Sequence, residues 1–96
     1  MNSTEMNRVF AYNESPVTFR KGDNVMVNAT EMAKPFGKQP AHWLRNQSVQ
    51  EFLAELSAMR NRNPNDLVQV TNGGDNYGTW FHEDVALEFT RWLSPN

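Results

Sequence analysis

The residues of this chain best suited to chemistry cluster between Lys34 and Gln47, and the chemistry that they suit is contact with a nucleic acid. Lysine and arginine side chains neutralise backbone phosphates, whereas glutamine and asparagine amides can pair with two groups on one adenine edge. The candidates for phosphate contact are Lys34, Lys38, Arg45, Arg60 and Arg62. The candidates for contact with base edges are Gln39, His42, Asn46 and Gln47, to which Arg45 is added as a possible partner of guanine.

Each of these side chains also has an ordinary structural explanation. A single exposed lysine or arginine is most often a solvated surface group. His42 fits an exposed helix position, and Asn46 could end a helix instead of contacting a base. Only the grouping near one turn favours phosphate contact. If all five cations touched phosphate, the logarithm of the DNA-binding constant would fall with the logarithm of the salt concentration with a slope of about −4.5. Binding would then be roughly 500-fold weaker at about 200 mM salt than at about 50 mM.

A glycine-rich segment is a second candidate for nucleic-acid contact. Two glycines allow a backbone to approach DNA closely, and asparagine side chains offer hydrogen-bond donors to the minor groove. The candidates in this segment are Asn72, Gly73, Gly74, Asn76 and Tyr77. An ordinary hairpin loop explains the same residues, and Asp75 favours that explanation because phosphate repels a carboxylate.

Catalysis has little support in the sequence. His82, Glu83 and Asp84 are adjacent, but the chain has only 2 His, and the other is His42, far away in the sequence. No spacing typical of a zinc site or a two-metal site occurs. Acidic residues at the start of a helix are explained by capping and by the helix dipole. We therefore predict no enzyme, no cofactor and no metal site.

The composition fits one small domain with an uneven charge. A chain of 96 residues without Cys suits a reducing compartment and offers neither disulfides nor thiolate ligands. The formal net charge is −2, but residues 1–38 and 39–65 each carry +1, whereas residues 66–96 carry −4. A protein that binds through one face would show such a division. No apolar stretch approaches the ~20 residues of a membrane span, so we expect a soluble protein without a membrane partner.

Three strands are expected near the N-terminus, after a flexible segment of residues 1–7. Apolar and polar residues alternate in these strands, and glycine, asparagine and aspartate separate the last two. Together they predict a meander made of Arg8–Tyr12, Pro16–Lys21 and Val25–Val27.

Three short helices should follow the meander. Asn28 is suited to cap the first helix and Glu31 to complete a capping box, while Pro35 should end that helix near Lys34. The other two are expected at Pro40–Arg45 and, behind a capping box of Ser48 and Glu51, at Val49–Arg60. The apolar face of the third helix is Val49, Phe52, Leu53, Leu56 and Met59.

The remaining elements are a loop, a hairpin and a last helix, so the order βββ-ααα-ββ-α predicts an α+β domain at residues 8–96. We expect a loop at Asn61–Asn65, strands at Leu67–Thr71 and Thr79–Phe81, and a helix at Glu83–Leu93. Large aromatic residues at this spacing should form a core rather than a base-stacking platform: Trp43, Phe52, Trp80, Phe81, Phe89 and Trp92.

Five fragments taken together resemble the KilA-N domain of bacteriophages and large DNA viruses. They are Val27–Lys34, Phe36–Lys38, Trp43–Asn46, Gly78–Ala86 and Arg91–Pro95. Each fragment is weak alone, but their order and spacing agree over nearly the whole chain. The family is similar to the APSES domain of fungal transcription factors, so the resemblance implies a DNA reader of the winged helix-turn-helix type. This chain departs from the pattern at Pro35, which shortens the first helix, and at Pro40-Ala41-His42, which makes the presumed reading helix less cationic.

The resemblance implies a DNA-binding module of a phage or prophage-type regulatory protein, which would act in the cytoplasm of a bacterium or of a phage-infected host. A helix at about residues 38–47 would enter the major groove of double-stranded DNA, and a hairpin wing at about residues 72–77 would lie over the backbone or the minor groove. The alternative is a protein-interaction module of a phage anti-repressor or regulatory switch that uses its acidic C-terminal third. A single module with net charge −2 would bind DNA weakly, so further domains or a homodimer would strengthen binding.

Overall fold

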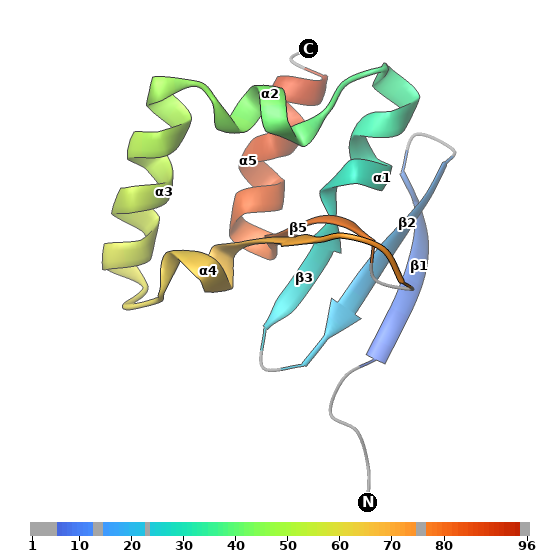
Figure 1. Cartoon of the computed structure of the whole chain (residues 1–96), viewed down its shortest axis with the longest axis horizontal. Coiled ribbons are helices and arrows are strands. Elements are labelled where there is room, and N and C mark those ends of the chain that lie inside the picture. Colours follow the sequence, from blue (N-terminus) through green and yellow to red (C-terminus); the bar gives the residue numbers. More distant parts are fainter. Residues whose placement is uncertain (1–5, 13–14, 23, 75–76, 95–96) are drawn as a thin grey trace, which may run out of the picture.

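The fold is one antiparallel sheet with helices packed against one of its faces (Figure 1). The computed structural model describes residues 6–12, 15–22, 24–74 and 77–94. Five strands form the sheet in the order β1-β2-β3-β5-β4. The predicted α+β architecture is confirmed, and the chain adds two short helical elements, η1 and α4, to the predicted order.

The predicted N-terminal meander is confirmed. β1 (Met6–Tyr12), β2 (Ser15–Lys21) and β3 (Val25–Asn28) pair in sequence order. β1 begins at Met6 rather than at the expected Arg8, and residues 1–5 lie outside the described part of the chain.

The predicted wing hairpin belongs to the same sheet as the meander. It consists of β4 (Val68–Thr71) and β5 (Gly78–His82), and β5 pairs with β3. Phe81 lies opposite Val27 in this pairing, so both side chains point to the helical face of the sheet. The hairpin is therefore joined to the core through a strand in the interior of the sheet.

The Asn28 segment links the sheet to the helices. The Asn28 Oδ1 accepts a hydrogen bond from the backbone N–H of Glu31 at 3.0 Å, so Asn28 caps α1 (Ala29–Ala33) as predicted. The Glu31 carboxylate accepts from the backbone N–H of Thr18 in β2 at 2.7 Å, so it ties α1 to the sheet rather than closing a capping box. A 3-10 turn, η1 (Lys34–Phe36), continues the chain, because the proline inside it has no N–H for a further α-helical bond.

One prediction and one open alternative at the turn between the next helices are wrong. α2 (Pro40–Leu44) is followed almost at once by α3 (Gln47–Met59), whose N-cap is Asn46. The Asn46 carbonyl accepts two N–H groups of the first turn at 3.0 and 3.1 Å, so Asn46 begins a helix and does not end one. Ser48 consequently lies inside the first turn, and the predicted Ser48–Glu51 capping box does not form.

A short helix, α4 (Pro64–Leu67), replaces part of the loop that was expected at residues 61–65. Asn63 caps it by accepting a hydrogen bond from the backbone N–H of Asn65 at 3.0 Å, and a proline occupies the first turn. Leu67 is buried in α4 instead of starting a strand. Met59, expected to face the core, is 76% exposed at the end of α3.

The last helix, α5 (Glu83–Leu93), has the predicted bounds. Five of the six predicted aromatic residues lie in or against the helical core, whereas Trp80 is buried on the other face of the sheet. Phe81 lies 5.4 Å from Trp43 of α2 and 5.0 Å from Phe89 of α5, measured between ring centroids. Trp43 and Phe89 are themselves 5.0 Å apart. Burial of these rings fixes α2 and α5 against the sheet.

Candidate nucleic-acid interface

Helix α2 carries the central group of candidate residues. Pro40 and Trp43 are buried, so one side of this short helix is held against the core. The opposite side is exposed and carries His42, with Gln39 just before the helix and Arg45 just after it. His42 and Arg45 share that side because residues three apart on a helical turn are neighbours.

The expected reading helix of residues 38–47 is two elements rather than one. α2 contains 5 residues and so rises by about 7.5 Å. Asn46 and Gln47 are exposed and belong to the start of α3, where the Gln47 Nε2 donates to the Glu51 Oε2 at 3.3 Å. The exposed surface available for base contact is therefore α2 together with the first turn of α3.

Lys38 is engaged within the fold. Its Nζ donates a hydrogen bond to the backbone carbonyl of Trp92 at 3.0 Å and lies 3.5 Å from that of Leu93. The same ammonium lies 4.7 Å from the centroid of the Trp92 ring. These carbonyls form the C-terminal, partially negative end of α5. The half-buried Lys38 thus completes a helix end, and contact with phosphate would require it to leave this position.

The other predicted cations divide into one paired side chain and three available ones. The Arg60 Nη2 lies 3.0 Å from the Asp84 Oδ2, which joins the end of α3 to the start of α5. Lys34, Arg45 and Arg62 are exposed, and within the described ranges their side chains make no ion pair or hydrogen bond. Their charges are therefore free to attract phosphate.

The β4–β5 hairpin carries the second group of candidates. Asn72, Gly73 and Gly74 are exposed, and the two glycines have φ of 77° and 76°, in the left-handed region that favours glycine. Tyr77 is 59% exposed. Asn76 lies outside the described residues, so its place in the hairpin is not assigned.

The turn end of β5 is held by the segment that caps α1. The Asn28 Nδ2 donates to the backbone carbonyl of Tyr77 at 3.2 Å, and the Thr30 Oγ1 accepts from the backbone N–H of Thr79 at 3.0 Å. Gly78 lies between them with φ of 127°, where a Cβ would come within 3.1 Å of the Asn28 Oδ1. Sequence reasoning assigned Asn28 only a capping role and missed this second one.

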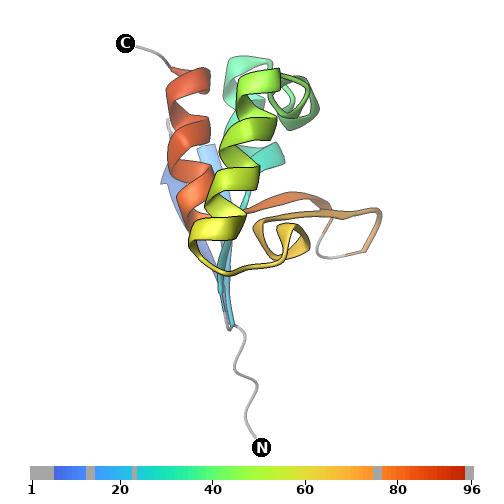
Figure 2. The same ribbon diagram turned by 90° about the vertical axis from the view of Figure 1, so that its left-hand side faces the viewer.

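The two groups of candidates project from the same side of the molecule. In Figure 2 the β4–β5 hairpin extends to the right, α2 lies on the right-hand side of the helices, and α5 lies on the left. In Figure 1 the same arrangement places α2 in front of α5. A single straight ligand could therefore meet α2 and the hairpin together.

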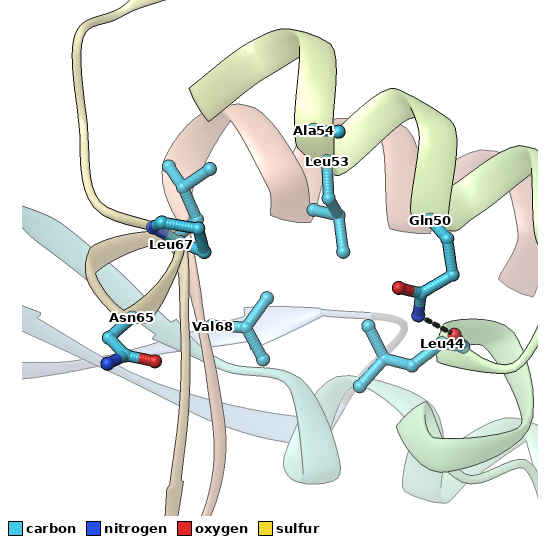
Figure 3. Close-up of a pocket in the computed structure, with 8 residues that line it drawn as sticks. Leu44, Gln50, Leu53, Ala54, Asn65, Leu67 and Val68 are labelled. Atoms are coloured by element: carbon cyan, nitrogen blue, oxygen red, sulfur yellow. Dashed lines mark hydrogen bonds between the residues drawn. The ribbon is translucent and has the colours of Figure 1, made fainter. Parts of the chain in front are cut away.

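An apolar pocket separates α2 from the strands of the hairpin (Figure 3). Its volume is about 410 Å³, and its walls include Leu44 at the end of α2, Leu53 of α3, and Leu67 and Val68 near the start of β4. The Gln50 side chain crosses one end and donates to the Leu44 carbonyl. None of the lining residues is charged, so the pocket itself supplies no phosphate contact.

The His82 group has a structural role. His82 is the N-cap of α5, and its Nδ1 accepts a hydrogen bond from the backbone N–H of Asp84 at 3.1 Å. Among the described residues, no three His, Cys, Asp or Glu side chains are grouped so that they could hold a metal ion. The described helices also include none that is long and apolar enough to cross a membrane.

These features define a class of protein: a small α+β domain in which short helices and a β-hairpin present polar residues on one side. Residues 10–96 match the KilA-N domain, and the chain belongs to this family. KilA-N domains are DNA-binding modules, not an enzyme family.

The relatives include viral and phage proteins. The chain is 32% identical over 73 residues to a KilA-N domain-containing protein of Acanthamoeba polyphaga mimivirus, which covers 73% of this chain and 20% of that protein. It is 32% identical over 81 residues to protein kilA of Escherichia phage P1, covering 82% of this chain and 29% of that protein. The chain thus spans less than a third of either relative. No solved structure matches it with statistical significance.

Proposed function

We propose that this domain binds double-stranded DNA through one face, with α2 and the first turn of α3 at the major groove and the β4–β5 hairpin over the backbone or the minor groove. The domain would serve as the DNA-binding module of a phage-type regulatory protein inside the cell. The base-contact residues would be Gln39, His42, Asn46 and Gln47, Arg45 would contact phosphate beside them, and the hairpin contacts would come from Asn72 to Tyr77.

This proposal rests on the observation that α2 and the β4–β5 hairpin project from the same side of the molecule. The helix offers exposed amide, imidazole and guanidinium groups, whereas the hairpin offers two glycines in left-handed conformations that leave its backbone uncovered. The major groove admits a helix, and a hairpin beside it can follow the adjacent backbone. Membership of a DNA-binding family supports the same reading.

The electrostatic contribution should be smaller than the sequence alone predicts. Lys38 and Arg60 are engaged within the fold, which leaves Lys34, Arg45 and Arg62 for phosphate. Three contacts imply a logarithmic salt slope of about −2.7, or roughly 40-fold weaker binding between about 50 and 200 mM salt. Base and hairpin contacts must then supply much of the affinity.

The test is fluorescence anisotropy with a random duplex of about 30 base pairs, measured between about 50 and 200 mM salt. Arg45→Ala should weaken binding by about 1–3 kcal/mol and make the salt slope shallower by about 0.9. Arg91→Ala is the matched control, because Arg91 is an exposed arginine near the end of α5, where its only ion partner among the described residues is Glu88 at 3.9 Å. Equal effects of the two variants would reject the α2 face.

A second candidate function is protein binding through α5. Leu87 is 69% exposed on this helix, with Glu83 one turn before it and Arg91 one turn after it. An exposed apolar side chain with charged neighbours suits a protein partner. Replacing Leu87 by Ala should leave DNA binding unchanged, so a DNA-binding defect in that variant would argue against separate faces.

A further inference from the structure

The sheet buries a second apolar centre on the face opposite the helices. Because strand residues alternate between faces, Trp80 points away from the helical side to which its neighbour Phe81 points. Trp80 is nevertheless only 1% exposed, and Met26 on the same face is 4% exposed. Something other than the helical layer must therefore cover Trp80.

Arg20 of β2 is part of that cover. Its guanidinium carbon lies 4.8 Å from the centroid of the Trp80 ring, a distance typical of a cation–π contact. The Arg20 Nη2 also donates a hydrogen bond to the Gln69 Oε1 at 2.8 Å. One half-buried side chain thus contacts both strands of the β4–β5 hairpin, Trp80 on β5 and Gln69 on β4.

This contact spans the sheet. β3 and β5 lie between β2 and β4 in the strand order, and in a flat sheet three strand spacings amount to about 14 Å. The Arg20 and Gln69 side chains share this distance and would both have to be fully extended in a flat sheet, so a sheet that curls towards Arg20 favours the contact. Figure 1 shows the hairpin running at a large angle to β1 and β2, as a strongly twisted sheet requires.

We propose that Arg20 is a positioning residue that fixes the angle of the β4–β5 hairpin relative to α2. Asn28 and Thr30 hold β5 at the turn end of the hairpin, and Arg20 adds a second attachment further from the turn, to Trp80 on β5 and to Gln69 on the edge strand β4. Two separate attachments stop an arm from pivoting about one of them. For DNA binding this rests on the proposed function, since a hairpin already held at the right angle loses less freedom on binding.

Arg20 acts through its shape and hydrogen bond rather than through its charge. Its guanidinium is directed at Trp80 and Gln69 within the sheet. A lysine keeps the charge but has neither the planar group for stacking nor the forked donors. Arg20→Lys should therefore behave like Arg20→Ala, whereas a phosphate-binding arginine would tolerate lysine.

Amide hydrogen exchange of the whole chain tests the attachment without DNA. Arg20→Ala and Gln69→Ala should each speed exchange of the β4–β5 amides by about tenfold, while the amides of α5 keep their wild-type rates. Lys21→Ala is the matched control, because Lys21 is the exposed neighbouring cation on β2 and should leave the hairpin rates unchanged. Unchanged hairpin rates in both Arg20→Ala and Gln69→Ala would overturn the proposal, and so would equal acceleration throughout the fold.

DNA anisotropy on the same variants separates this inference from the proposed function. The expected result is a loss of roughly fivefold to tenfold in affinity for Arg20→Ala, Arg20→Lys and Gln69→Ala, with little change for Lys21→Ala. Wild-type affinity in Arg20→Lys, despite a loosened hairpin, would refute the role of Arg20 in positioning the hairpin for DNA. If the wild-type domain binds no DNA while the exchange result holds, the attachment stands and the proposed function fails.

Discussion

Lys38→Ala should destabilise the fold without removing a phosphate contact. The variant loses the hydrogen bond from the ammonium to the Trp92 carbonyl, the interaction with the negative end of α5 and the contact with the Trp92 ring. A hydrogen bond to a charged group contributes about 1.5–3 kcal/mol, the dipole about 0.3–1 and an exposed cation–π contact about 0.5–1. Ordering a lysine side chain costs about 2 kcal/mol, so the net loss should be about 1–2 kcal/mol.

The assay is thermal and urea denaturation followed by far-ultraviolet circular dichroism. For a domain of this size, a loss of about 1–2 kcal/mol lowers Tm by about 5–12 °C. Lys34→Ala is the control, because Lys34 is exposed and has no side-chain partner among the described residues. It should leave Tm unchanged and make the salt slope of DNA binding shallower by about 0.9. If Lys38→Ala melts with the wild type and instead reduces the salt slope, the assignment of Lys38 to the end of α5 is wrong.

Three further predictions concern the salt response and the turn end of the hairpin. The wild-type salt slope in anisotropy titrations should be about −2.7, and a slope near −4.5 would mean that Lys38 and Arg60 leave their partners to meet DNA. Asn28→Asp keeps the acceptor that caps α1 but loses the donor to the Tyr77 carbonyl. Urea denaturation should therefore show a free energy of unfolding lower by about 1–3 kcal/mol. An unchanged free energy of unfolding would show that this hydrogen bond contributes nothing. Gly78→Ala should cost more stability than Gly73→Ala, because both glycines have positive φ but only at Gly78 would the added Cβ meet atoms of Asn28 and Thr30. We expect a loss of about 2–4 kcal/mol for Gly78→Ala and of about 1–2 kcal/mol for Gly73→Ala. Equal shifts in Tm would contradict the contact at Gly78.

The sequence by itself determined most of the local elements and most of the residues that form the core, but it missed η1 and α4 and placed the exposed Met59 in the core. Strand alternation and helical periodicity identified all five strands and the bounds of α5, because these patterns record which side of an element is buried. Asn28 was recognisable as a helix cap because capping acts within a few residues. Near the α2–α3 turn the local signals competed: both Asn46 and Ser48 are good caps, and the side-chain pattern does not say which backbone turns first.

Tertiary structure alone decided which candidate side chains remain free. Lys38 and Arg45 look alike in the sequence, yet Lys38 lies at the end of α5, more than fifty residues away along the chain, and Arg45 is exposed. Distant segments are likewise joined by the pairing of β5 with β3, by the hydrogen bond from Asn28 to the turn end of the hairpin and by the hydrogen bond from Arg20 to Gln69. Periodicity and capping report only a residue's near neighbours along the chain, whereas these contacts depend on how a twisted sheet brings separate strands together. The direction of the hairpin relative to α2 is therefore a property of the folded chain.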